Sequence, residues 1–262
     1  MSLPLLRAGL KNLASAEERV EHELALAEKF GARLVTVLDG DYPVNLRLIP
    51  DRPPFLFYRG EFRQREDARS VAVVGTRTAS PDGLRQAATM ARLLVDHGVT
   101  VTSGLAEGID TAAHRATLDS GGRTIAVLGT GIAKVFPAAN STLSEEIATR
   151  GVLVSQFWPS MRPSSWTFPR RNIVTSGISQ GTVVVEASST SGAKMQARIA
   201  IEHGKRVWLV GSLVLGQEWA RRYLERGAVK VDNVEDVVAM LADPERLQRA
   251  ARQQQQLALE IL

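Results

Sequence analysis

The chain has 262 residues, of which 44% are hydrophobic and 23% are charged, as in ordinary globular proteins. Its formal net charge is +4, which favours an anionic partner. Because it has no cysteine and its four histidines stand far apart, disulfides, thiolate chemistry and cysteine nucleophiles are excluded, and neither a metal nor a cofactor is expected. No hydrophobic run reaches the ~18 residues of a membrane span, and residues 1–10 do not resemble a signal peptide, so we expect a cytoplasmic protein without membrane contact.

A short helical segment opens the chain. From Ser15 to Phe30, hydrophobic residues recur at helical spacing, and Gly31 stands where such a helix would end. We therefore predict a helical N-terminal segment over residues 1–31. A strand is predicted next, over Ala32–Leu38.

The following stretch is predicted to be irregular. Four prolines interrupt Asp39–Tyr58, and the charged piece Gly60–Arg69 has the composition of a linker. The main core is therefore expected to begin near residue 70, within a domain that spans residues 32–242.

From Ser70 onward, short β-branched runs alternate with longer helical patterns, as in βα units. The predicted strands are Val71–Val74, Val99–Thr102, Ile125–Leu128, Leu153–Phe157, Val183–Val185, Val207–Val210 and Val229–Val231. The predicted helices are Gly83–His97, Ile109–Ser120, Ser141–Thr149, Gly192–His203 and Glu218–Arg226. This alternation predicts an α/β protein with a Rossmann-like, mainly parallel sheet and helices on both faces.

The end of the chain is predicted to be helical. Val234–Leu241 has a helical pattern, and residues 243–262 form a polar, glutamine-rich helical tail with few hydrophobic anchors. The tail is interpreted either as a weakly packed end or as a docked or oligomerising helix.

Glycine-rich turns follow three consecutive predicted strands. They contain Gly75-Thr76-Arg77, then Ser103-Gly104, then Gly129-Thr130-Gly131. In a parallel sheet these turns lie at one edge, where backbone N–H groups can approach a phosphate. Any one glycine could instead just permit a tight turn. None of the turns fits the P-loop pattern or a complete dinucleotide-binding fingerprint, so an ATPase or a dehydrogenase is disfavoured.

Two arginine-containing segments favour a nucleic acid. Arg77 directly follows a glycine turn, where it could hold a phosphate or simply lie on the surface. The segment from Ser165 to Asn172 combines cations for phosphates with aromatic faces for bases. Its residues of interest are Trp166, Phe168, Arg170, Arg171 and Asn172, and the two aromatic ones could equally belong to the core.

Further polar residues follow later strands. Ser191 and Gly192 open a helix whose N–H groups could bind an anion, with Lys194 adding charge. Glu186 is interpreted mainly as a helix cap or an arginine partner, although it could bind a hydroxyl or act as a base. Asp110 and His114 share a helix face and are expected to form a hydrogen-bonded pair that braces the pocket, not an acid/base dyad.

These motifs together resemble the DprA/Smf family of DNA-processing proteins, over roughly residues 32–241. The matching blocks are Asp41–Pro43, Pro53–Gly60, Val74–Arg77, Ser103–Asp110, Ala113–His114, Gly121–Gly129, Phe168–Asn172, Glu186–Ala187 and Ser191–Gly192. So many blocks in the same order make the resemblance specific.

The resemblance implies an extended Rossmann-like fold that binds single-stranded DNA through a basic pocket, usually as a homodimer. It implies a protein, not an enzyme, that protects incoming DNA and helps to load the RecA recombinase in natural transformation. The residues expected to contact DNA phosphates are Gly75, Thr76, Arg77, Ser103, Gly104, Arg170, Arg171, Asn172, Ser191, Gly192 and Lys194.

The chain also departs from the family pattern. The N-terminal helical domain is expected to be shortened to about one helix, and the C-terminal winged-helix domain to be absent. Between Gly211 and Arg221, the family's Pro-Gly-Ser and Gly-x-Asn turns are replaced, which is expected to weaken one wall of the pocket. The residues that would contact a recombinase are not identified by these motifs.

Two alternative functions remain open. The first is a small-nucleotide-binding protein or a nucleoside-monophosphate hydrolase on the same fold, with Glu186 as its acidic residue, although the Pro-Gly-Gly-x-Gly-Thr loop of such enzymes is missing. The second is a scaffold whose pocket is vestigial and whose glutamine-rich tail contacts a partner.

Overall fold

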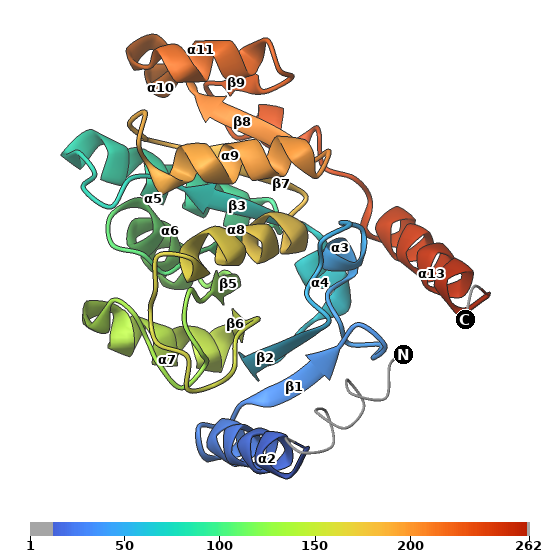
Figure 1. Cartoon of the computed structure of the whole chain (residues 1–262). Helices are drawn as coiled ribbons and strands as arrows, with labels where there is room; N and C mark the ends of the chain where they lie inside the picture. Colours follow the sequence, from blue (N-terminus) through green and yellow to red (C-terminus); the bar gives the residue numbers. More distant parts are fainter. Residues whose placement is uncertain (1–12, 261–262) are drawn as a thin grey trace.

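The computed structural model describes residues 13–260, which are built around one nine-stranded sheet (Figure 1). The strands are β1 (Arg33–Thr36), β2 (Phe55–Gly60), β3 (Ser70–Val74), β4 (Thr100–Ser103), β5 (Thr124–Val127), β6 (Val152–Ser155), β7 (Gly181–Val184), β8 (Arg206–Val210) and β9 (Val229–Val231). Their order in the sheet is β1-β2-β6-β5-β4-β3-β7-β8-β9. All neighbours from β6 to β9 are parallel, whereas β2 is antiparallel to both β1 and β6. The predicted α/β, mainly parallel fold is confirmed.

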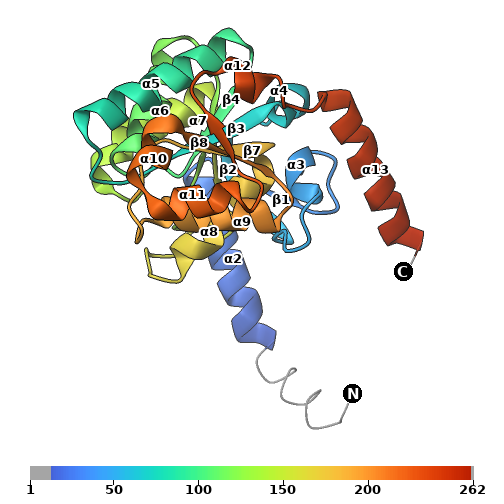
Figure 2. The same ribbon diagram turned by 90° about the horizontal axis from the view of Figure 1, so that it is seen from above.

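Helices cover both faces of the sheet because the central strands are hydrophobic on both sides. In β3, Val71 and Val73 pack with one layer of helices, while Ala72 and Val74 pack with the other. The first layer contains α5 (Pro81–Asp96), α6 (Ile109–Asp119), α7 (Ser141–Arg150) and α12 (Glu235–Val238). The second contains α3 (Val44–Arg47), α8 (Thr167–Ile178), α9 (Gly192–Glu202), α10 (Gly211–Gly216) and α11 (Glu218–Leu224). Figure 2 shows α5 and α6 on the opposite side of the sheet from α8 and α9.

The sheet reverses direction next to β3. The chain runs outward from β3 through β4, β5 and β6, and then crosses back to β7 on the other side of β3. Such a reversal leaves a crevice at the carboxyl ends of the two strands, which is the usual place for a ligand in open α/β sheets.

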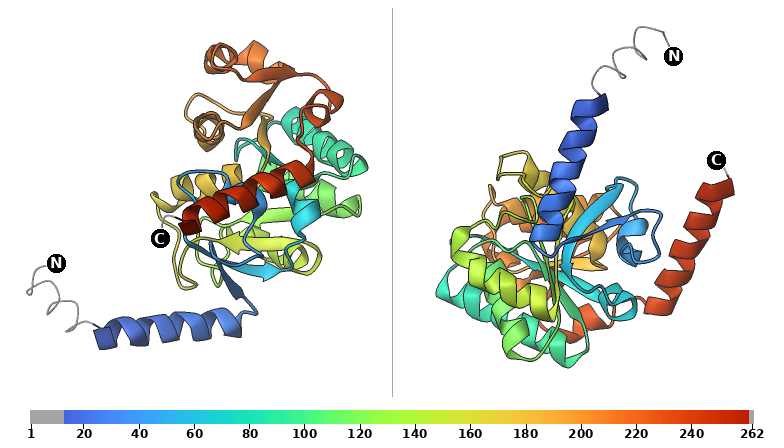
Figure 3. Two further views of the ribbon diagram at one scale, coloured as in Figure 1. Left: turned by 90° about the vertical axis from the view of Figure 1, so that its right-hand side faces the viewer. Right: turned by 90° about the horizontal axis from the view of Figure 1, so that it is seen from below.

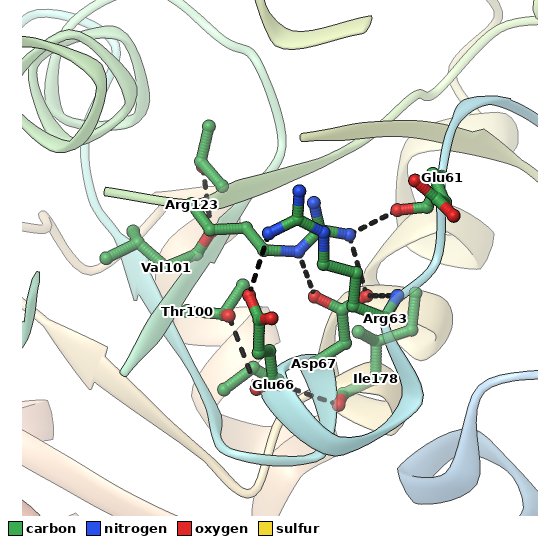
Figure 4. Close-up of polar contacts among 10 residues, drawn as sticks. Glu61, Arg63, Glu66, Asp67, Thr100, Val101, Arg123 and Ile178 are labelled. Carbon is green, nitrogen blue, oxygen red and sulfur yellow. Dashed lines mark hydrogen bonds and ion pairs between the residues drawn. The ribbon is translucent and has the colours of Figure 1, made fainter. Parts of the chain in front are cut away.

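Three elements were missed in the region predicted to be irregular or a linker: α3, β2 and a helix within the linker. β2 joins the sheet between β1 and β6, so residues before 70 contribute to the same core. The predicted linker contains α4 (Gln64–Ala68), in which Asp67 is buried. Its carboxylate forms an ion pair with Arg123 at 2.7 Å and accepts from the backbone N–H of Arg63 at 2.7 Å (Figure 4). The linker prediction is therefore wrong.

Two helices lie at the ends of the chain: α2 projects from the body in both views of Figure 3, and α13 stands at its edge in the right-hand view. The first is α2 (Leu13–Lys29), which ends before Gly31 at a φ of +64°; the rest of the predicted N-terminal segment, residues 1–12, lies outside the described residues. The second is α13 (Pro244–Glu260), which packs against α3 and α4 and buries Ala251, so the tail is docked at its beginning. Residues 261–262 of the predicted tail lie outside the described residues. No described helix is long and apolar enough to cross a membrane.

Candidate functional site

A pocket of about 370 Å³ opens at the crevice next to β3. It collects residues from the turns after β3, β4 and β7 and from the first two turns of α8. Eight of the eleven predicted site residues line it: Gly75, Thr76, Arg77, Gly104, Arg171, Asn172, Ser191 and Gly192. The structure therefore brings these predicted segments together at one edge of the sheet.

Three predicted site residues do not line this pocket. Ser103 is fully buried, and its hydroxyl donates to the Val73 carbonyl at 2.7 Å. Arg170 is exposed and is absent from the pocket lining, and the Lys194 ammonium donates to the Ser189 carbonyl at 3.2 Å. Ser103 has no exposed surface for a ligand, whereas Arg170 and Lys194 could contact DNA only outside the pocket.

The third glycine-rich turn supports the pocket from behind. A Cβ on Gly129 would lie 2.6 Å from Cδ1 of Phe168, so the missing side chain lets that ring approach the strand end. Only two of the three glycine-rich turns thus contribute directly to the lining.

Arg171 is the central cation of the pocket. Its residue surface is only 8% exposed, and one Nη donates to the Val127 carbonyl at 3.2 Å. Burial lowers the pKa of Arg171, with the Asp110 charge opposing that shift. Within residues 13–260, no carboxylate lies at ion-pair distance from it, and its Nε has no hydrogen-bond partner. A buried cation that interacts with Asp110 only beyond ion-pair distance is incompletely compensated, which makes this pocket suited to an anionic ligand.

Gly104 makes room for that guanidinium. A Cβ at this position would lie 1.4 Å from one Nη of Arg171, so only glycine permits the observed approach. The Gly104 N–H in turn donates to the Asp110 carboxylate at 3.1 Å. The turn after β4 is thereby fixed beneath the arginine.

The predicted Asp110–His114 pair is not formed. Asp110 accepts from the backbone N–H groups of Gly104 and Ala106, whereas His114 Nδ1 contacts the Thr124 hydroxyl at 2.6 Å. Burial raises the pKa of Asp110 and lowers the pKa of His114 to about 3, with Arg171 adding to the lowering at the histidine. Asp110 thus braces the turn after β4, whereas His114 contacts the start of β5, because the backbone donors of the tight turn satisfy the carboxylate first.

Arg77 and Phe168 line the pocket, and Phe136 lies beside them in an adjoining cavity of about 80 Å³. The Arg77 guanidinium lies over the ring of Phe168, 5.1 Å from its centre, and the Phe136 ring lies 5.9 Å from that of Phe168. Arg77 is exposed, so its charge remains available to solvent or ligand. Phe136 was missed, because nothing in its own segment points to the pocket.

The start of α9 is open toward the pocket. The Ser191 hydroxyl accepts from the Ala193 N–H at 3.2 Å, and a Cβ on Gly192 would meet nothing within 4 Å. The N–H groups of Ala193 and Lys194 already donate to Ser191, so it is the partial positive charge of the helix start that favours an anion here.

Glu186 supports the N-cap residue of α5, Ser80, and is not itself a helix cap. Its carboxylate accepts from the Ser80 N–H at 3.1 Å and from the Ser80 hydroxyl at 2.8 Å, at the beginning of α5. It does not line the pocket around Arg171.

The altered segment after β8 forms α10 and α11 instead of an open turn. Trp219 is buried, and its indole N–H donates to the Ala187 carbonyl at 3.3 Å. This contact holds the loop that leads from β7 to Ser191. The segment therefore supports the pocket wall indirectly, where weakening was expected.

Comparisons with known proteins agree on one family. The family model described as DNA recombination-mediator protein A matches residues 33–242. DNA processing protein DprA of Streptococcus pneumoniae is 36% identical over 206 residues, covering 78% of this chain and 72% of that protein. Protein Smf of Escherichia coli is 35% identical over 239 residues, covering 90% of this chain and 64% of that protein.

Solved structures give the same result. The crystal structure of the Streptococcus pneumoniae DprA superposes with a TM-score of 0.72 at 33% identity, covering 80% of this chain and 74% of that one. A DprA structure from Helicobacter pylori, described for its single-stranded DNA binding mode, superposes with a TM-score of 0.70 at 25% identity. That match covers 80% of this chain and 95% of the Helicobacter chain.

Proposed function

The chain belongs to the DNA recombination-mediator protein A family of DNA-processing proteins, and from this premise we propose that it binds single-stranded DNA, with phosphates held in the pocket around Arg171. The observation that carries the proposal is the buried Arg171 guanidinium, which lines the pocket and has no carboxylate at ion-pair distance among the described residues. A phosphate in the pocket would supply an anion beside this cation.

A polynucleotide fits better than an isolated anion. Arg77 supplies a second cation at the rim, and the adjacent rings of Phe136 and Phe168 offer apolar faces beside it. Phosphate contacts together with exposed aromatic faces are the means by which proteins bind single strands without strong sequence preference.

The cellular role that we propose follows from the family. The protein would protect incoming single-stranded DNA and assist in loading the RecA recombinase during natural transformation and recombination, acting as a homodimer and not as an enzyme. The bound strand would then be the substrate handed to the recombinase.

Hydrolysis of a nucleotide is the competing function, and the position of Glu186 argues against it. Both of its carboxylate oxygens are directed at Ser80 at the start of α5, outside the pocket lined by Arg171. We expect no release of free base from a nucleoside monophosphate. Base release that Glu186→Gln abolishes would replace the binding proposal with an enzymatic one.

Salt dependence of DNA binding tests the proposal. Fluorescence anisotropy with a labelled oligothymidylate should show an affinity that falls steeply with salt, because bound phosphates release counterions. Arg77→Ala should lower the affinity about tenfold and reduce the slope of log K against log salt by about 0.7. A binding constant that is insensitive to salt would contradict the proposal.

Arg206→Ala is the matched control for this test. Arg206 is exposed and begins β8, so it lies at the opposite edge of the sheet from the pocket. Both substitutions remove one positive charge, but only Arg77→Ala should change the affinity strongly. Equal losses in the two variants would mean that overall charge, and not the pocket, binds the DNA.

A further inference from the structure

Resting on the proposed function, we propose that the first turn of α8 carries a second contact for the DNA strand outside the pocket. One base would stack on Trp166, and a neighbouring phosphate would bind Arg170. We call these two residues the α8 platform. It would bind the part of a single strand that extends beyond the pocket.

Trp166 occupies a position that helix stability does not explain. It is the N-cap of α8, where Ser, Thr, Asp or Asn is favoured, and its side chain makes no capping hydrogen bond. The indole is 51% exposed, whereas Trp208 is fully buried and Trp219 is 6% exposed. Trp166 is therefore accessible to a base, two residues before Phe168, which lines the pocket.

The exposed indole is nevertheless held in place. Its ring packs edge-to-face with the buried Phe157, with ring centres 5.5 Å apart and planes at 84°. A fixed ring loses little conformational freedom when a base stacks on it. Stacking needs an open base face, which a single strand offers and a duplex does not.

Arg170 lies one helical turn beyond Trp166 and is exposed. Within residues 13–260 its guanidinium has no ion pair or hydrogen bond, although its carbonyl accepts from Gln156 Nε2 at 2.6 Å, which fixes the turn. Some arginines on other helices are instead paired. Arg198 and Arg222, for example, each pair with a glutamate four residues away on the same helix. Arg170 is therefore a cation that the protein leaves available to an external anion.

The helical period connects this platform to the pocket. Phe168, Arg171 and Asn172 line the pocket, while Trp166 and Arg170, four residues apart, share a different face of the same turn. Four residues span about 6 Å along a helix, which is close to the size of one nucleotide. A strand that leaves the pocket over this turn would meet both residues in succession.

The dependence of affinity on DNA length tests the platform. Anisotropy is measured with oligothymidylates of about 4 and about 16 nucleotides, the limits of typical single-strand sites. In the unmodified protein the longer DNA should bind more tightly, and Trp166→Ala should reduce the ratio of the two affinities about tenfold. Arg170→Ala should reduce the same ratio. A ratio that neither substitution changes would overturn the proposal.

Phe30→Ala is the control for removing an exposed aromatic side chain. Phe30 is 39% exposed and precedes β1 at the amino-terminal edge of the sheet, so its loss should leave the ratio unchanged. Tryptophan fluorescence gives an independent readout: the long oligothymidylate should quench the emission of the unmodified protein, and Trp166→Phe should remove most of that quenching. Equal quenching in the variant would also overturn the platform.

Failure of the platform and failure of the proposed function give different results. If both lengths bind with salt dependence but the ratio is insensitive to Trp166, only the platform is wrong. If neither length binds, the proposed function is wrong and the platform fails with it.

Discussion

At the scale of single residues, Gly104 decides whether Arg171 can occupy the pocket. In Gly104→Ala the new methyl group would lie where an Nη of Arg171 now lies, so the guanidinium must move. We expect the affinity for single-stranded DNA to fall about tenfold, as for loss of a phosphate-binding arginine. The free energy of unfolding should change by less than about 1 kcal/mol, because a flexible side chain can yield and alanine suits this backbone.

Anisotropy and urea unfolding measured on the same variant separate these two effects. Gly40→Ala is the control, since a Cβ at Gly40 would meet nothing within 4 Å. Normal DNA affinity in Gly104→Ala would mean that the observed position of Arg171 is not needed for binding.

His114 makes the free energy of unfolding depend on pH. Burial, followed by the Arg171 charge, lowers the pKa of His114 to about 3 from its usual 6.5. Between pH 6.5 and about 3, this imidazole therefore takes up a proton in the unfolded chain but not in the folded chain. The free energy of unfolding falls as the pH falls through this window. The slope from this residue should approach about 1.4 kcal/mol per pH unit.

Urea unfolding at several pH values measures this slope. His114→Gln keeps a polar side chain but cannot take up the proton, so its stability should depend less on pH below 6.5 than that of the unmodified protein. Identical slopes in the two proteins would contradict the assignment to His114.

Much of the site could be predicted from sequence, because βα turns of a parallel sheet must meet at one edge. Gly75, Gly104 and Ser191 were found in this way. The roles of neighbouring arginines could not be separated, since Arg170 and Arg171 face different directions only once α8 is known. Phe136 lies in a different loop from its partner Phe168, and no spacing rule joins them.

At the scale of secondary-structure elements, the pair Asp67–Arg123 attaches α4 to the start of β5 (Figure 4). Their side chains are 7% and 10% exposed. Removing one partner leaves a buried charge, so Asp67→Asn and Arg123→Met should each lower the free energy of unfolding by about 3–5 kcal/mol. The double variant should lose less than the sum of the two single losses.

Urea unfolding of the four proteins completes this double-mutant cycle. The exposed pair Arg85–Asp82 on α5 serves for comparison, and its removal should cost less than about 1 kcal/mol. Strict additivity at Asp67 and Arg123 would mean that the two charges do not stabilise each other.

The hydrophobic pattern was sufficient to predict the seven strands from β3 to β9, but it did not reveal β2 or α8. β2 follows two prolines and was assigned with them to an irregular stretch, although Leu56 and Phe57 are fully buried. α8 lacks a recognisable polar face, because Ser176 and Gly177 are buried along with its apolar residues. A Cβ on Gly177 would lie 2.3 Å from Leu46, so this helix is shaped by its contact with α3. Such packing between two helices cannot be predicted from the helix propensity of the local sequence.

At the scale of the whole molecule, the pocket and α13 lie at opposite ends of the strands. The pocket is at the carboxyl ends, whereas α13 packs against α4, which precedes β3 (Figure 1). Arg65 and Glu245 form an exposed ion pair between the two helices at 3.6 Å. The net charge of +4 is modest, so DNA binding must depend on where the unpaired cations lie and not on their number.

This arrangement predicts that the tail is dispensable for binding DNA. Deleting residues 244–262 should leave the affinity for oligothymidylate within about twofold, because phosphate contacts act locally under screening salt. The free energy of unfolding should fall by less than about 3 kcal/mol, since Ala251 is the buried residue among the α13 side chains that the structure describes. Ala242, which the deletion retains, still donates its N–H to Gln180 at 2.7 Å and closes the preceding segment.

Anisotropy measures the DNA affinity of the deletion variant, and urea unfolding measures its stability. A second variant, Ala251→Asp in the full chain, should undock the same helix without shortening it. The two proteins should lose similar stability and retain DNA binding, because a buried aspartate without a partner drives α13 from α3 and α4. A tenfold loss of affinity in the deletion but not in Ala251→Asp would assign a DNA contact to the tail itself. A tenfold loss in both would instead mean that docking of α13 at one end of the strands controls the pocket at the other.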